Sequence, residues 1–210
     1  MACLLTGARC LTVMWIRPVG RHKNRTQGVC RGASRRNGKS NRWFIPHYLE
    51  SSALGISRSS AEVIDVMRRY GESGLTLVGH SRGAMTIGNA MEALETEGDS
   101  TGSLLDTDVK LVGPAYNAQE AANRLDRLSD GFSSGVDLQN HADDFVGTII
   151  GKNPATYDNR PEESSSFNEK LGIFGDAPTV HSCYGTGEVH RDCERKYDKA
   201  PTMNIQPKKL

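Results

Sequence analysis

The sequence predicts an α/β fold with a mostly parallel sheet and flanking helices. Short runs at residues 75–78 and 109–112 have the length and composition of strands, the first of them buried. Residues 135–141 predict a further short strand, in which Val136 and Leu138 alternate with polar residues. Around these runs lie stretches whose apolar residues recur at helical spacing. Because strands and helices alternate along the chain, the strands are expected to pair in parallel.

The first predicted helix precedes residue 71. Ser59 and Glu62 have the spacing of a capping box, in which each side chain bonds a backbone N–H at the helix start. Ile64 and Met67 follow on one apolar face, and Gly71 is expected to end the helix.

The strand at 75–78 runs directly into Gly79-His80-Ser81-Arg82-Gly83, and a second helical pattern follows. This context is that of a nucleophile elbow, where a strained strand-to-helix turn projects a serine hydroxyl above the sheet. The alternative is a tight turn whose serine only caps the helix. The apolar positions of the following helix are Ala84, Ile87, Met91 and Leu94.

A third helix is predicted after the strand at 109–112, which ends at Gly113-Pro114. Asn117 is expected to cap this helix, with Glu120 at its third position. Its apolar face comprises Ala118, Ala121, Leu125 and Leu128.

Two aspartates, Asp143 and Asp144, follow the strand at 135–141. Open α/β sheets collect reactive groups at the carboxyl ends of their strands, so either carboxylate could orient a catalytic base. Asp144 is favoured because the apolar residues from Phe145 onward should bury its surroundings, and Asp143 is the near rival. The alternative for both is a capping or turn aspartate.

Three histidines follow Ser81 in the sequence: His141, His181 and His190. Serine hydrolases built on an α/β sheet have the chain order nucleophile, acid, base, which His141 fits poorly. His190 lies in a charged run and is expected to be solvated. His181 is expected at the end of a last strand that opens into a Gly-rich loop, from which it can reach the serine; the alternative is an ordinary surface or core histidine.

These segments together resemble the second half of an α/β-hydrolase, particularly of the lipase and esterase branch. The resemblance covers about residues 55–187 and rests on the strand-GHSRG-helix unit, the Asp-x-Val-Gly segment at 144–147 and the Val-His pair at 180–181. It implies a partial or minimal α/β-hydrolase that cleaves carboxylic esters, of small molecules or lipids, without a cofactor.

Carried onto this chain, the resemblance implies that Ser81 is the nucleophile, Asp144 the orienting acid and His181 the general base and later general acid. Arg82 would donate its backbone N–H to the oxyanion. A second donor in the family comes from a loop after an early strand, often marked by His-Gly or Gly-Gly. No such mark occurs upstream, where Pro46-His47-Tyr48 is the nearest candidate.

Several segments are also similar to serine-hydrolase-like C-terminal regions of large bacterial secreted proteins of the filamentous-haemagglutinin and polymorphic-toxin kind. These segments are residues 111–115, 142–147 and 181–187. This second resemblance implies a secreted or cell-surface location, and without it a cytoplasmic one is expected. It also keeps open a non-catalytic role as an adhesion or toxin-delivery module.

The charge distribution divides the chain. Residues 1–42 contain ten of the 26 Lys and Arg and none of the 25 Asp and Glu. We therefore predict a basic, poorly ordered arm (1–42), an α/β-hydrolase-like domain (43–187) and a charged tail (188–210). The arm could contact nucleic acid or an anionic lipid surface, or be a targeting or non-native segment, so nucleic-acid binding is a further alternative. Upstream strands could come only from residues 11–16 or 43–49.

The remaining features concern cysteines, metals and membranes. Cys183 and Cys193 are spaced to close a small loop beside His181 in an exported protein; the alternative is two free thiols. No Cys and His spacing resembles a zinc site, so no metal is expected. No apolar run reaches the roughly 18 residues of a membrane span. Residues 151–178 are expected to form a long loop of the kind that includes active-site lids.

Overall fold

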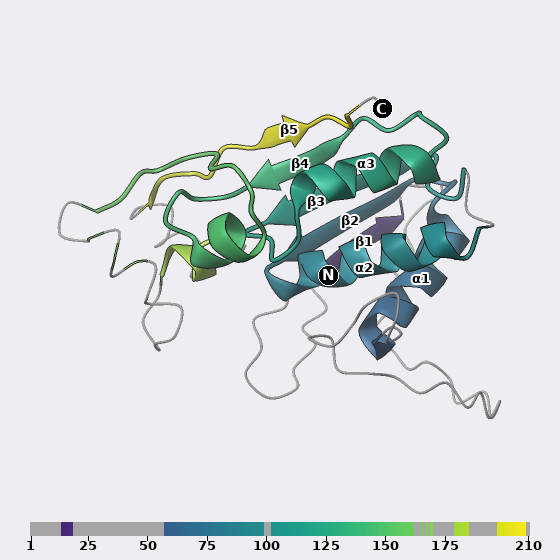
Figure 1. Ribbon diagram of the computed structural model, residues 1–210, viewed down its shortest axis with the longest axis horizontal. Helices are drawn as coiled ribbons and strands as arrows, with labels where there is room; N and C mark the ends of the chain where they lie inside the picture. Colours follow the sequence, from purple (N-terminus) through teal and green to yellow (C-terminus); the bar gives the residue numbers. More distant parts are fainter. Residues whose placement is uncertain are drawn as a thin grey trace.

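Five strands form one mixed sheet with the spatial order β1-β2-β3-β4-β5 (Figure 1). The computed structural model describes residues 14–18, 57–98, 102–161, 179–184 and 197–208, together with Ser165, Phe167 and Glu169. The central strands pair in parallel, whereas the edge strands β1 and β5 run antiparallel to them. The α/β class is confirmed, and parallel pairing is confined to the centre. The strands are β1 (Met14–Pro18), β2 (Leu75–His80), β3 (Thr107–Val112), β4 (Val136–Gln139) and β5 (Met203–Ile205).

Both edge strands lie outside the predicted domain limits of 43–187. β1 belongs to the segment predicted as a basic arm, and Met14 to Ile16 of this strand overlap the apolar run at 11–16. β5 belongs to the segment predicted as a charged tail and pairs with β4. The sheet therefore includes strands from beyond these limits at both ends. The rest of the arm and the second upstream run, 43–49, lie outside the described residues.

The three α-helices of the described chain pack on one face of the sheet (Figure 1). They are α1 (Arg58–Tyr70), α2 (Arg82–Thr96) and α3 (Ala118–Leu128). The strands alternate, with apolar side chains toward the helices and mainly polar ones toward the other face. This second face carries Thr76, Asp108, Lys110, Asp137 and Asn204, a pattern typical of a sheet with one solvated side. The predicted flanking helices are thus present, on one side of the sheet.

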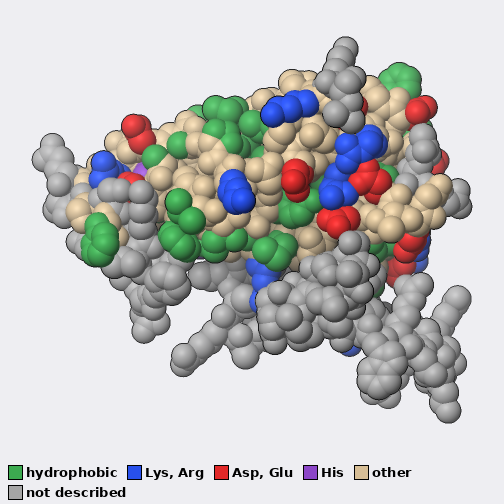
Figure 2. Space-filling view, viewed as in Figure 1, with side chains coloured by type: hydrophobic (Ala, Val, Ile, Leu, Met, Phe, Trp, Pro, Cys, Tyr) green, Lys and Arg blue, Asp and Glu red, His purple; other side chains and the backbone are tan. Residues whose placement is uncertain are grey.

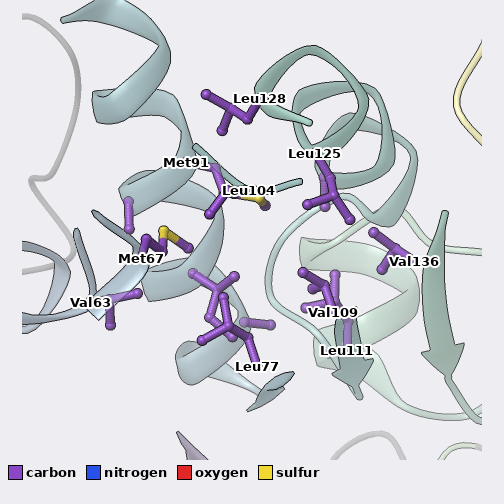
Figure 3. Packing of buried hydrophobic residues seen from close by; sticks show 14 of the residues in the cluster. Val63, Met67, Leu77, Met91, Leu104, Val109, Leu111, Leu125, Leu128 and Val136 are labelled. Atoms are coloured by element: carbon purple, nitrogen blue, oxygen red, sulfur yellow. The ribbon is translucent and has the colours of Figure 1, made fainter. Parts of the chain in front are cut away.

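A single core fills the space between the helices and the sheet (Figure 3). Met67 of α1, Met91 of α2 and Leu125 of α3 meet Leu77 and Leu111 of the central strands, and all five side chains are fully buried. The helical and strand patterns of the sequence therefore identified the core correctly. The apolar faces predicted for the second and third helices are buried throughout.

Of the two helix caps predicted from the sequence, that of α3 is present in the structure and that of α1 is not. Asn117 caps α3, and its side chain accepts the N–H of Glu120 at 3.0 Å, as predicted. The cap of α1 is Ser57, whose hydroxyl accepts the N–H of Ser60 at 3.2 Å, so the predicted capping box of Ser59 and Glu62 is wrong. Glu62 instead pairs with Arg58 one turn earlier.

Charged side chains of both signs gather over α2 and α3 (Figure 2). Arg124 of α3 pairs with Glu92 at 3.1 Å and with Glu95, both on α2, and Arg127 pairs with Glu95 as well. Glu95 bridges the two arginines, so this network joins the two helices above their apolar contact. It lies away from the carboxyl ends of the strands.

The carboxyl ends of β2, β3 and β4 point to the same end of the sheet (Figure 1). Two short helical segments lie there: the π-helix η2 (Val146–Ile150) and the 3-10 helix η4 (Val180–Ser182). The expectation that residues 179–185 end a last strand is wrong, since Val180–Ser182 is a helical turn. The end of the sheet where ligands gather in open α/β folds is therefore built from β2, β3, η2 and η4.

Candidate active site

Ser81 lies in the turn between β2 and α2 with a backbone conformation that is rare for a residue with a side chain. Its φ is 53° and its ψ is −120°. The Ser81 N–H donates to the Val112 carbonyl at 3.0 Å, and its own carbonyl accepts the N–H of Ala84 at 3.1 Å. The surrounding bonds thus fix a strained turn, and the hydroxyl makes no capping bond to the helix. The alternative of a capping serine is not what this structure contains.

Gly79 permits this turn because the helix passes directly over the strand. A Cβ at Gly79 would lie 2.7 Å from the Ala84 nitrogen and 2.8 Å from the Ala84 Cα. Any side chain there would force α2 away from β2. The first glycine of the G-x-S-x-G pattern is therefore explained by close packing of the helix on the strand.

His181 reaches the serine from η4. Its Nε2 lies 2.9 Å from Ser81 Oγ, although the two residues are 100 positions apart. Thr179 and Ser182 form a capping box that closes the 3-10 turn, and the Val180 N–H donates to the buried carboxylate of Glu169 at 3.3 Å. The predicted approach of His181 to Ser81 is confirmed. Glu169 was not singled out in the sequence, where a lone glutamate carries no signal.

Asp144 contacts the other ring nitrogen of His181. Both carboxylate oxygens lie 2.9 Å from Nδ1, and the side chain is fully buried. Oδ1 also accepts the N–H groups of Val146 and Gly147, at 2.9 and 3.2 Å, at the start of η2. The run Asp-x-Val-Gly thus places two backbone donors on the carboxylate.

The surroundings of Asp144 favour its ionised form. Burial raises the pKa of the carboxyl, but hydrogen bonds and charge from His181, with further hydrogen bonds from Gly147 and Tyr184, hold the net pKa below its ordinary value. An ionised carboxylate on Nδ1 requires that nitrogen to carry the proton, which leaves the lone pair of Nε2 facing Ser81 Oγ. His181 therefore has the tautomer that a general base needs.

Asp143, the rival acid, points elsewhere. Its Oδ2 pairs with Arg160 Nε at 3.0 Å, and its N–H donates to His141 Nδ1 at 2.9 Å. The prediction that Asp144 lies nearer than Asp143 to the second nitrogen of His181 is confirmed. Asp143 belongs to the structural surroundings of His141.

His141 is fully buried and has a structural place. Because its Nδ1 accepts the Asp143 N–H, its Nε2 carries the proton and donates to the Asn159 carbonyl at 2.8 Å. Both ring nitrogens are thus occupied, and the ring packs edge-on against Tyr157 with centroids 4.7 Å apart. His190 lies outside the described residues.

Gly113 provides the space in which Asp144 and His181 meet. It has a φ of 47°, and a Cβ there would lie 2.5 Å from Asp144 Oδ2, 2.8 Å from Tyr184 Cε2 and 3.3 Å from His181 Nδ1. Tyr184 is buried beside this point, and its hydroxyl accepts the His141 N–H at 2.6 Å. Burial and the charge of Asp144 raise the pKa of Tyr184 well above its ordinary value. The Gly113-Pro114 pair after β3 was visible in the sequence, but the role of Gly113 depends on residues that are distant along the chain.

Asn153 was also missed, and it joins the loops beneath the site. Its Nδ2 lies within hydrogen-bond distance of the carbonyls of Pro114, Tyr116 and Gly147. Its Oδ1 accepts the N–H of Ala118 at 2.7 Å. The loop after β3, the start of α3 and η2 therefore share one buried amide, which fixes Gly147 near Asp144.

Arg82, the predicted oxyanion donor, is the first residue of α2. The first N–H groups of a helix have no acceptor within the helix, so the Arg82 N–H is free of intrahelical bonding beside the serine. The candidate second donor at 46–48 lies outside the described residues.

Three further expectations concern other chemistry. The described residues hold no group of three or more His, Cys, Asp or Glu side chains with the geometry of a metal site. In the same part of the chain, no helix has both the length and the apolar character needed to span a bilayer. Cys183 is disulfide-bonded, and its expected partner Cys193 lies outside the described residues.

No protein-family model matches the chain, and neither the curated proteins nor the solved structures contain a significant match to it. The functional conclusion therefore depends on the site itself. In that site a serine hydroxyl, an imidazole and a buried carboxylate form a continuous hydrogen-bonded row on a strained strand-to-helix turn.

Proposed function

We propose that this protein is a serine hydrolase that cleaves carboxylic esters through an acyl-enzyme, in the manner of lipases and esterases. The observation that carries the proposal is the row Ser81 Oγ, His181 Nε2 and Nδ1, and Asp144, with 2.9 Å at each junction. Nucleophile, base and orienting acid within hydrogen-bond reach are what activation of a serine requires.

In the proposed first half-reaction, His181 Nε2 takes the proton of Ser81 as Oγ attacks the ester carbonyl carbon. The carbonyl π electrons move to oxygen, and the resulting oxyanion accepts the Arg82 N–H. The intermediate then collapses. The bond to the alcohol oxygen breaks, that oxygen takes the proton from His181, and the acyl group remains on Ser81.

In the second half-reaction, water attacks the acyl-enzyme and gives its proton to His181. Collapse of the second intermediate releases the carboxylic acid and returns the proton to Ser81 Oγ. Asp144 stabilises the imidazolium that forms in both halves, because its carboxylate stays ionised and bonded to the Nδ1 proton. Each residue of the row has one role in this cycle.

The substrate class is a carboxylic ester of a small molecule or a lipid. A secreted or cell-surface location is part of the same proposal, and the disulfide at Cys183 supports it because such bonds persist in oxidising compartments.

The proposal is tested by mixing the full chain with p-nitrophenyl acetate and p-nitrophenyl butyrate. An acyl-enzyme predicts turnover, with an initial release of nitrophenol near one equivalent per chain if deacylation is slower. Complete absence of nitrophenol release above the rate of the buffer, with a folded protein, would contradict the proposal.

A further inference from the structure

His80 is the residue of the elbow that the proposed reaction leaves without a role. It ends β2 immediately before Ser81 and is paired in register with Val112 of β3. Its Nε2 lies 2.9 Å from the carbonyl oxygen of His181. Because a carbonyl oxygen can only accept, Nε2 of His80 carries the proton and donates it.

The two imidazole rings also contact each other. Their centroids lie 4.8 Å apart with an interplanar angle of 31°, and the ring of Tyr184 lies 5.9 Å from His80. His80 therefore touches both the backbone and the ring of His181. Within the described residues, His80 is the side chain that bonds the His181 carbonyl, and this bond joins the 3-10 turn directly to the central sheet.

We infer that His80 is a positioning residue for His181, an inference that rests on the proposed hydrolase function. The serine belongs to a rigid strand-to-helix unit, whereas the base belongs to a single 3-10 turn that must be held at the same distance through the reaction. His80 directly precedes Ser81, so its hydrogen bond to the His181 carbonyl links the turn of the base to the strand that carries the serine. A misplacement of roughly 1 Å in such a site can cost about a hundredfold in rate.

Two substitutions separate the hydrogen bond from the bulk of the side chain. The amide nitrogen of glutamine is the same number of bonds from Cα as His Nε2, so His80→Gln keeps a donor that can reach the carbonyl. The amide nitrogen of asparagine is one bond closer to Cα, so His80→Asn keeps a polar amide that cannot reach the His181 carbonyl. The two variants carry the same amide group at the same position, so a difference between them reports the hydrogen bond to His181.

We expect kcat of His80→Asn to fall by about tenfold, the effect of one lost hydrogen bond of ordinary strength, while His80→Gln stays within about threefold of the native protein. KM should change little in both variants, because His80 acts on His181 and not on the substrate. In the native protein, nitrogen NMR of the imidazoles should find His80 protonated at Nε2.

The results separate a failure of the proposed hydrolase function from a failure of the positioning role of His80. A native protein without esterase activity would overturn the proposed function and this inference together. A native protein that is active, with His80→Asn and His80→Gln equal in kcat or both unchanged, would overturn the positioning role alone. A proton on His80 that is found only at Nδ1 would also overturn the positioning role. Thermal unfolding of both variants establishes that they are folded.

Discussion

The turn that carries Ser81 and the turn that carries His181 are built in opposite ways. Around Ser81 the contacts come from its own strand and helix and from the neighbouring strand β3. Ala84 bonds the Ser81 carbonyl, Gly79 lets the same Ala84 approach the strand, and the Val112 carbonyl accepts the Ser81 N–H. Around His181 the contacts reach across 11 positions to Glu169, 37 to Asp144 and 101 to His80. The place of Ser81, the proposed nucleophile, therefore depends on one strand-turn-helix segment and the strand beside it. The place of His181, the proposed base, depends on contacts from three separate parts of the chain.

This difference predicts that damage to the elbow and damage to the base should have different signatures. Changes at Ser81 should abolish chemistry without affecting the remaining site. Changes around His181 should act through the distances from the base to Ser81 and to Asp144.

The largest effect is expected for Ser81→Ala. Removing the hydroxyl eliminates acyl-enzyme formation, so the rate of ester hydrolysis should fall by about 10³-fold or more. The cooperative thermal transition should remain, because the hydroxyl makes no cap to α2. Steady-state hydrolysis of p-nitrophenyl butyrate measures the rate. Turnover equal to that of the native protein would remove Ser81 from the mechanism.

Asp144→Asn should be nearly as severe. The amide cannot stabilise the imidazolium and favours the wrong tautomer of His181, which predicts a loss in kcat on the order of 10³–10⁴-fold. The control is Asp143→Asn, because Asp143 pairs with the partly exposed Arg160 and makes no bond to His181. Its kcat should stay within about threefold of native. Equal losses in the two variants would contradict the assignment of the acid.

Gly113→Ala should reduce kcat by about a hundredfold. The added Cβ would lie 2.5 Å from Asp144 Oδ2, so the carboxylate must move away from His181. Gly131→Ala is a matched control, since Gly131 also has a positive φ and a Cβ there meets nothing within 4 Å. The control should lose stability from backbone strain and keep its kcat. Kinetics of both variants at a temperature where both are folded decide the point.

A smaller effect is expected at Glu169, which holds the other side of the His181 turn. Its buried carboxylate accepts both the Val180 N–H and the Tyr197 hydroxyl, the latter at 2.8 Å. Glu169→Ala should lower kcat by about tenfold and destabilise the protein, because two buried donors lose their acceptor. Glu169→Gln retains an acceptor oxygen and should recover most of both. If the two variants behave alike, the carboxylate does not support the turn through these bonds.

The smallest effect concerns strain stored at the elbow. Ser81 has a φ of 53°, which glycine adopts at little cost and alanine does not. Both variants lack the hydroxyl, so Ser81→Gly should exceed Ser81→Ala in unfolding free energy by about 1 kcal/mol. Denaturant titration measures the difference. A lower stability for the glycine variant would show that the turn is not strained.

The same contrast explains which parts of the fold were predictable. The central strands, the helix after Ser81 and the Asn117 cap follow from patterns within a few residues, and all are present. The predicted capping box of Ser59 and Glu62 failed because α1 begins at Arg58 with Ser57 as its cap, so Ser59 already lies in the first turn. Of the edge strands, β1 overlaps the run at 11–16 that the sequence offered as a possible upstream strand. β5 could not be foreseen, because its three residues are too few for a strand pattern and pair with β4 only in the folded chain.

The site was predictable to the extent that chain order and local context constrain it. Ser81, Asp144 and His181 were selected from the elbow, from the apolar residues that follow Asp144 after β4, and from the order of the three residues along the chain. Gly113, Glu169 and Asn153 were missed, since each acts on residues brought near only by folding. The proposed reacting groups lie in short motifs that the sequence displays. The residues that hold these groups in place belong to no such motif.

The most direct test of the serine, histidine and aspartate as one unit is covalent labelling with a fluorophosphonate, followed by mass spectrometry. The native protein should carry one adduct, on Ser81 within the tryptic peptide of residues 70–82. The variant His181→Gln should be labelled far more slowly, because its serine lacks a base. An adduct on another residue, or native labelling no faster than that of the denatured chain, would contradict the assignment.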